Sequence, residues 1–245
     1  MQDGNFLVSD MSPTAPVKVL LTGFGPFLDV KTNPSWEIAR KLPPSIAGLH
    51  GESIQIIVPT DPMPAAYHDI RDQVMALIDA HAPDLVVHMG LDVDSRGIFR
   101  VERSAQREGY HQFPDICRKV FTRAENKTAF AKSPVSLSTT LDLDAAEDVW
   151  RSGCATITLA TNDDSHHRAK KTKRPEKQSV LVQLGDDVGT YVCGFCYYVA
   201  LLHLQTHTGT RRAVFFHVPP LETEADMAVG VRVTQELIRA LVQVM

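Results

Sequence analysis

A cysteine and a histidine in the last quarter of the chain have the spacing and setting of a nucleophile and its base. Cys193 follows the turn-forming residues GDDVGTY and falls in the first turns of an apolar helical segment. Unpaired backbone N–H groups and the positive end of the helix dipole stabilise a thiolate there and can also hold an oxyanion. His217 ends the apolar strand-like run RAVFFHVP. We therefore expect the two side chains to meet at one edge of a sheet.

A carboxylate is needed to fix the tautomer of such a histidine. Glu102, in the segment IFRVERSA, is the best placed along the chain. Spacing alone leaves open a second interpretation, in which Glu102 is a surface residue paired with Arg100 or Arg103. The next candidates for the carboxylate are Asp92 and Asp94.

The motif Cys193-Gly-Phe-Cys196 also allows a different chemistry, that of a dithiol redox pair. Thioredoxin-like modules place this motif after an early strand, whereas here it comes late. A buried thiol on the same helix face is the simpler interpretation of Cys196. Neither Cys117 nor Cys154 has the setting of a nucleophile, and four cysteines are too few for a disulfide scaffold.

The glycine-rich turn GFGPFL imitates a dinucleotide-binding fingerprint without completing it. Leu28 stands where the third glycine should be, and no helix begins at once. Phe24 and Phe27 instead flank glycines at the carboxyl end of a strand, where open α/β sheets bind ligands, which favours a pocket. The sequence has no H-E-x-x-H, no paired C-x-x-C and no G-x-S-x-G, so we expect no metal and no cofactor.

The elements that would position these residues alternate between strand and helix. Apolar runs at 17–22, 53–59 and 84–90 predict buried strands, the last with His88 as a core residue, and helical periodicity follows the first two. This alternation predicts one α/β domain, a three-layer α/β/α sandwich around an open, mostly parallel twisted sheet. We place it at residues 17–245, after a flexible leader at 1–16.

Two segments interrupt this pattern. Residues 91–140 are polar and irregular, apart from a strand-like piece near Ile98, and predict a long connection with surface hairpins. A basic insert at about 162–178 includes HHRAKKTKRPEK (166–177), which holds six Lys or Arg and predicts a solvated loop. ATITLA and SVLVQL flank the insert, and the sequence does not decide which of them joins the main sheet.

Composition narrows the class of protein. The chain has 245 residues, of which 44% are apolar and 22% charged, with a net charge of −4. These values exclude disorder as the main state and indicate no binding to nucleic acid or to a membrane. The start of the chain lacks the apolar core of a signal peptide, so we expect a cytoplasmic protein, with its oligomeric state left open.

Three segments taken together resemble the pyroglutamyl-peptidase I family, also called pyrrolidone carboxyl peptidases. They are LLTGFGPF with TNPSWEIARKL, then DVGTYVCGFCYY, then FFHVPPL, and the resemblance spans about 17–244. The chain lacks the Gly-Gly-Arg and Ile-Thr-Pro-Glu-Arg patterns of the commoner bacterial form. It is more similar to the divergent eukaryotic form.

The resemblance implies a cysteine exopeptidase that removes an N-terminal pyroglutamyl (5-oxoproline) residue from small peptides through a thioester, without cofactor or metal. The alternatives are the dithiol redox protein and a catalytically silent relative that binds through its basic insert. The site residues it implies are catalytic Cys193, His217 and Glu102, pocket walls Phe24 and Phe27, and backbone groups near Gly90 and Leu91 for the lactam.

Overall fold

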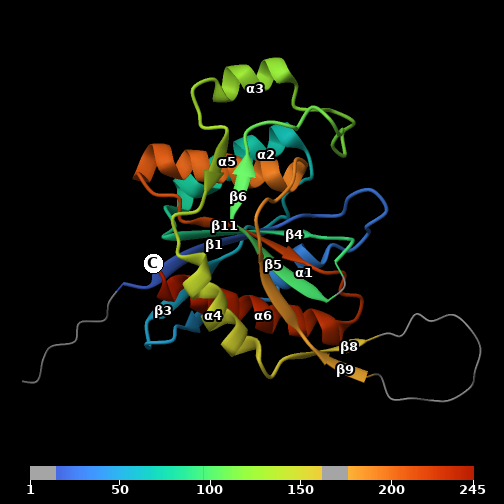
Figure 1. Cartoon of the computed structure of the whole chain (residues 1–245), viewed down its shortest axis with the longest axis vertical. Coiled ribbons are helices and arrows are strands. Elements are labelled where there is room, and N and C mark those ends of the chain that lie inside the picture. Colours follow the sequence, from blue (N-terminus) through green and yellow to red (C-terminus); the bar gives the residue numbers. More distant parts are fainter. Residues whose placement is uncertain (1–14, 96, 162–175) are drawn as a thin grey trace, which may run out of the picture.

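A seven-stranded sheet forms the centre of the protein. The computed structural model describes residues 15–95, 97–161 and 176–245 (Figure 1). The strand order across the sheet is β10-β5-β11-β4-β1-β3-β2. The strands are β1 (Val17–Gly23), β2 (Ser45–Ala47), β3 (Ser53–Ile57), β4 (Leu85–Leu91), β5 (Ile98–Glu102), β10 (Leu181–Gly185) and β11 (Ala213–Val218).

Most neighbouring strands of this sheet run parallel. The parallel pairs are β1 with β3, β1 with β4, β4 with β11, and β5 with β10. Strand β5 is antiparallel to β11, and the edge strand β2 is antiparallel to β3. The mostly parallel α/β sheet predicted from the sequence is therefore confirmed.

Helices cover both faces of the sheet, which gives the three expected layers (Figure 1). Helices α2 and α5 pack together on one face, and α1, α4 and α6 pack on the other. Helix α3 lies outside α2 and α5 in this view. The helices are α1 (Pro34–Ala39), α2 (Tyr67–His81), α3 (Arg123–Phe130), α4 (Leu143–Cys154), α5 (Val192–Thr208) and α6 (Glu224–Gln243). Within the described ranges, none of them is long and apolar enough to cross a bilayer.

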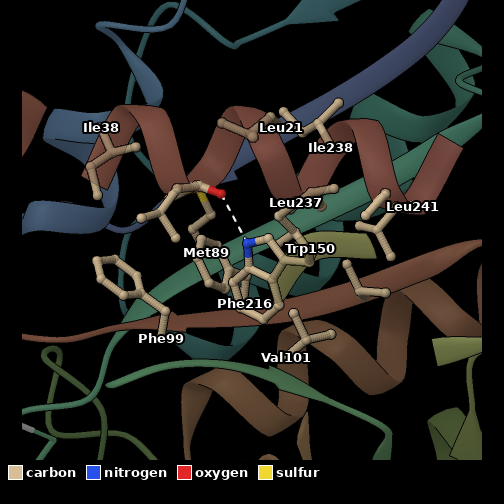
Figure 2. Packing of buried hydrophobic residues seen from close by; sticks show 14 of the residues in the cluster. Leu21, Ile38, Met89, Phe99, Val101, Trp150, Phe216, Leu237, Ile238 and Leu241 are labelled. Carbon is tan, nitrogen blue, oxygen red and sulfur yellow. Dashed lines mark hydrogen bonds between the residues drawn. The ribbon is translucent and has the colours of Figure 1, made fainter. Parts of the chain in front are cut away.

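The core under α4 and α6 is built around one tryptophan (Figure 2). The Trp150 ring meets Phe216 of β11 edge-on at 5.6 Å, and Phe216 stacks on Phe99 of β5 at 6.1 Å. The indole N–H donates to the Val233 carbonyl of α6 at 3.1 Å, so this buried polar group is satisfied. This hydrogen bond connects α4 to α6 on the sheet face where Trp150 packs against β11.

Local signals explain where the helices begin and end. Asn33 caps α1 by accepting from the Ser35 N–H, and Pro34 occupies the first helical position, where its missing N–H costs nothing. Helix α5 ends at Gly209, which adopts φ +74° in the left-handed region that glycine tolerates best.

The prediction of an irregular connection at 91–140 is wrong in two respects. Strand β5 is a full member of the central sheet rather than a surface piece. Helix α3 also lies in this segment and begins with a capping box between Thr122 and Glu125. Two short strands, β6 (Ser104–Gln106) and β7 (Ser136–Ser138), form an antiparallel pair, and α3 lies between them in the sequence.

The structure also decides between the two strand candidates around the basic insert. Strand β10, from SVLVQL, joins the central sheet, whereas β8 (Thr158–Thr161) pairs only with β9 (Glu176–Ser179), away from that sheet (Figure 1). Positions 176 and 177, predicted to be loop, belong to β9. The rest of the predicted solvated loop, 166–175, lies outside the described residues, as does most of the leader.

Candidate active site

The first turn of α5 presents Cys193 at the sheet. Tyr191 is the N-cap residue, and no side chain caps this helix start. The N–H groups of the first turn therefore have no partner within the helix and keep their capacity to donate. The Cys193 thiol packs directly against Gly90. A Cβ atom added to this glycine would lie 3.0 Å from Sγ and 2.8 Å from the Phe215 ring. Only glycine leaves room for the thiol at this position.

Strand pairing brings His217 to the same place. Strands β11 and β4 run parallel, and His217 lies directly beside Gly90 in their register. The two strands end together at the carboxyl edge of the sheet, as expected for a ligand site in an α/β fold. The imidazole is mostly buried, with 12% of the side chain exposed.

Glu102 reaches the histidine from β5. Because β5 is antiparallel to β11, Glu102 pairs with Phe215, two residues before His217 and on the same sheet face. His217 Nδ1 donates to Glu102 Oε1 at 2.8 Å, and the carboxylate is only 2% exposed. The ring leaves Nε2 for the thiol. The surface interpretation of Glu102 is therefore wrong.

The other candidate partners of this carboxylate and this histidine are engaged elsewhere. Arg100 bonds the Asp92 carboxylate at 3.0 Å and stays 4.0 Å from Glu102 Oε1. Arg103 pairs with Asp144. Asp92, the next candidate in the sequence, thus holds Arg100 rather than the histidine.

Gly185 of β10 provides the seat for the Glu102 carboxylate. The two residues pair in the β5–β10 register, and a Cβ on Gly185 would lie 2.1 Å from Glu102 Oε2. Among the described residues this second oxygen has no hydrogen-bond partner. The absence of a side chain at 185 therefore allows the carboxylate to face His217.

Burial and the two neighbours act on His217 in opposite directions. Burial alone lowers its pKa, but hydrogen bonds and charge interactions with Cys193 and Glu102 outweigh it and raise the pKa from 6.5 to about 9. His88 of β4 is fully buried, and this burial lowers its pKa to about 3. His88 bonds the Thr22 hydroxyl at 2.7 Å and is the core residue that the sequence predicts.

The remaining cysteines have different surroundings. Cys196 is fully buried, and burial, followed by the charge of Cys193, raises its pKa well above the usual value. Burial likewise raises the pKa of Cys154 to about 12. Cys117 is exposed, on a loop. A buried thiol of raised pKa is a poor member of a redox pair, so the geometry does not favour the dithiol alternative.

Phe24 and Phe27, the predicted pocket walls, belong to the same apolar cluster as Cys193. Phe24 is buried, with its ring 6.4 Å from Phe215, and Phe27 is half-buried. Leu91, half-buried, ends β4 beside Gly90. The structure therefore gathers all seven predicted site residues at one edge of the sheet. No group of three or more His, Cys, Asp or Glu in the described part of the chain is arranged to hold a metal ion.

Sequence reasoning missed two tyrosines near the nucleophile. Tyr67 begins α2 and meets Tyr191 edge-on at 6.1 Å. Burial is the largest cause that raises the pKa of both phenols, and the charges of Asp115 and, more weakly, Cys193 add to it. The position of Tyr191 two residues before Cys193 was the only signal in the sequence, since Tyr67 lies far away along the chain.

Comparison with known proteins agrees with this arrangement. The family model described as pyroglutamyl peptidase matches residues 17–141. Human pyroglutamyl-peptidase 1 is 30% identical over 203 residues, which cover 83% of this chain and 79% of the human protein. The chain belongs to the pyroglutamyl peptidase family. The pyrrolidone-carboxylate peptidase of Thermococcus onnurineus, 27% identical over 85% of this chain and 86% of its own, is a more distant member.

Solved structures of pyroglutamyl peptidases share the fold. The pyroglutamyl peptidase I of Bacillus amyloliquefaciens superposes with a TM-score of 0.66, over 93% of this chain and 96% of its own, at 19% identity. The higher identity to the human protein fits the eukaryotic-like form that the sequence predicts.

Proposed function

We propose that this protein is a cysteine exopeptidase that removes an N-terminal pyroglutamyl residue from peptides. The observation that carries the proposal is the 2.8 Å bond from His217 Nδ1 to a buried Glu102, with Cys193 on the other side of the ring at an uncapped helix start. The names of the relatives give the substrate class. Phe24 and Phe27 are the proposed pocket walls.

The proposed reaction begins with a thiolate–imidazolium pair of Cys193 and His217. The thiolate attacks the acyl carbon of the pyroglutamyl residue, and the oxyanion accepts hydrogen bonds from N–H groups at the start of α5. His217 then gives its proton to the departing peptide amine, which leaves a thioester. Water, deprotonated by His217, attacks the thioester and releases pyroglutamate and the thiolate. Glu102 acts as a positioning residue that holds the imidazole.

The proposed binding site suits an uncharged lactam. Backbone groups near Gly90 and Leu91 are the proposed partners for its N–H and C=O. A free glutamate would bring a charged side chain against Phe24 without a partner, which costs several kcal/mol by typical transfer energies. We also propose a reducing, cytoplasmic compartment, because the mechanism needs a free thiol and all four cysteines are unpaired.

Hydrolysis of pyroglutamyl-aminomethylcoumarin tests the proposal. We expect turnover by the native chain, no turnover of glutamyl-aminomethylcoumarin, and a loss of about 10⁴-fold or more in kcat for Cys193→Ser. Cys117→Ser is the matched control, since that thiol is exposed and free. Turnover that survived Cys193→Ser, or its absence in the native chain, would refute the assignment.

A further inference from the structure

A cavity of about 260 Å³ lies between helix α3 and the segment 107–111, which follows β6. We call it the α3 cavity. None of the seven predicted site residues lines it. In Figure 1, α3 lies outside α2 and α5, the two helices that cover this face of the sheet. A cavity of this volume suits a ligand smaller than a typical drug.

Cationic side chains outnumber acidic ones in the lining of the α3 cavity. Arg123 and Lys127 lie four residues apart on α3, and so on one face of that helix, and Arg107 lines the cavity from the segment after β6. The one carboxylate of the lining is that of Glu108, which pairs with Arg107 at 2.8 Å. Among the described residues, neither Arg123 nor Lys127 has a carboxylate within ion-pair distance. The lining therefore attracts an anion.

Arg123 meets a second basic side chain at the cavity. Its Nε donates to His111 Nε2 at 3.1 Å, and both residues belong to the lining. Within the described ranges, the two terminal nitrogens of this guanidinium have no acceptor in the protein. These nitrogens are the ones that bind the oxygens of a phosphate or a carboxylate as a pair.

The lining is held in place before any ligand binds. Asn126 of α3 is 8% exposed, and its amide donates to the Arg107 carbonyl at 2.6 Å, which joins the two sides of the cavity. The buried rings of Tyr110 and Phe121, also in the lining, pack against Phe195 of α5 at 5.0 and 4.7 Å. A ligand that enters a preformed site of this kind causes little further ordering of the chain.

We propose that the α3 cavity binds the phosphate group of a small molecule, with Arg107, Arg123 and Lys127 as the donors. A phosphate ester carries a charge of about −1.5 to −2 at pH 7, which balances the excess of cations over Glu108. A carboxylate would balance only part of it. This site is separate from the proposed peptidase site, so the test needs no turnover.

Isothermal titration at low salt and about pH 7, with phenyl phosphate and with inorganic phosphate, tests the site. We expect saturable binding by the native chain, and the tighter of the two probes identifies a small organic phosphate or free phosphate as the ligand. Arg123→Gln/Lys127→Gln should weaken binding by at least about tenfold, because a hydrogen bond to a charged group contributes about that factor. Lys127→Glu, which reverses one exposed charge, should weaken it likewise.

The matched control is Arg118→Gln/Lys132→Gln, which removes the same two charges from exposed residues outside the lining. It should bind both probes as the native chain does, and melting temperatures establish that each variant is folded. Three results would overturn the proposal: no saturable binding by the native chain, native affinity in Arg123→Gln/Lys127→Gln, or equal weakening in the two double variants. The third result would show that only the overall charge of the protein attracts the anion.

Discussion

Glu102→Gln isolates the charge of the buried carboxylate, because the amide keeps the shape and can still accept from His217. Raising a histidine pKa from 6.5 to about 9 corresponds to roughly 3 kcal/mol of preference for the imidazolium. Burial opposes this preference, so Cys193 and Glu102 must supply more than that between them. Loss of the carboxylate charge should therefore lower the pKa of His217 substantially.

The assay is kcat/KM for pyroglutamyl-aminomethylcoumarin against pH. In the native chain, activity should fall as pH rises through about 9, where the imidazolium that protonates the leaving amine is lost. In Glu102→Gln this basic limb should move to lower pH by about one unit or more, and kcat should fall by about 10²- to 10⁴-fold. Asp92→Asn is the control, since that carboxylate bonds Arg100, and its limb should stay in place. An unmoved limb in Glu102→Gln would refute the reasoning.

Two further substitutions test the surroundings of the site. Gly185→Ala should lower kcat by about tenfold or more, because its methyl group would lie 2.1 Å from Glu102 Oε2 and force the carboxylate away from the histidine; native kinetics in a folded variant would contradict this seat. Cys196→Ala should keep kcat within about twofold, with only a lower melting temperature from the small cavity. Loss of turnover in that variant, with Cys193 intact, would revive the dithiol alternative.

The parts of the fold that the sequence predicts are those with strong local signals. Strands β1 and β4 are mostly apolar, and the residues of α2 that face the core recur at helical spacing. Helix α3 was missed because it buries only Asn126 and Phe130 and so lacks an apolar stripe. Its capping box, Thr122 with Glu125, was the one readable signal.

Some residues of the candidate site can be predicted from local sequence, whereas the position of others depends on strands that are distant along the chain. Cys193 and His217 follow from a helix start and a strand end, which are local features. The place of Glu102 depends on β5 running antiparallel to β11 and on their register, and no local pattern specifies either. The seat at Gly185 depends on a third strand, β10. A glycine at a strand end is compatible with several local structures, and only the strand pairing shows that Gly185 makes room for the Glu102 carboxylate.

Burial raises the free-energy cost of binding a charged substrate. The same burial strengthens the charge interaction between His217 and Glu102. His217 and Glu102 are almost removed from solvent, so the carboxylate stabilises the imidazolium more than it would in water. A glutamyl residue entering this region would bring a second carboxylate, and the cation that could accept it is already held by Glu102 and Cys193. A lactam brings only one N–H and one C=O, for which backbone groups near Gly90 and Leu91 are the proposed partners. The proposed preference for pyroglutamate over glutamate thus follows from the site's charges, because Glu102 and Cys193 already pair with the His217 cation.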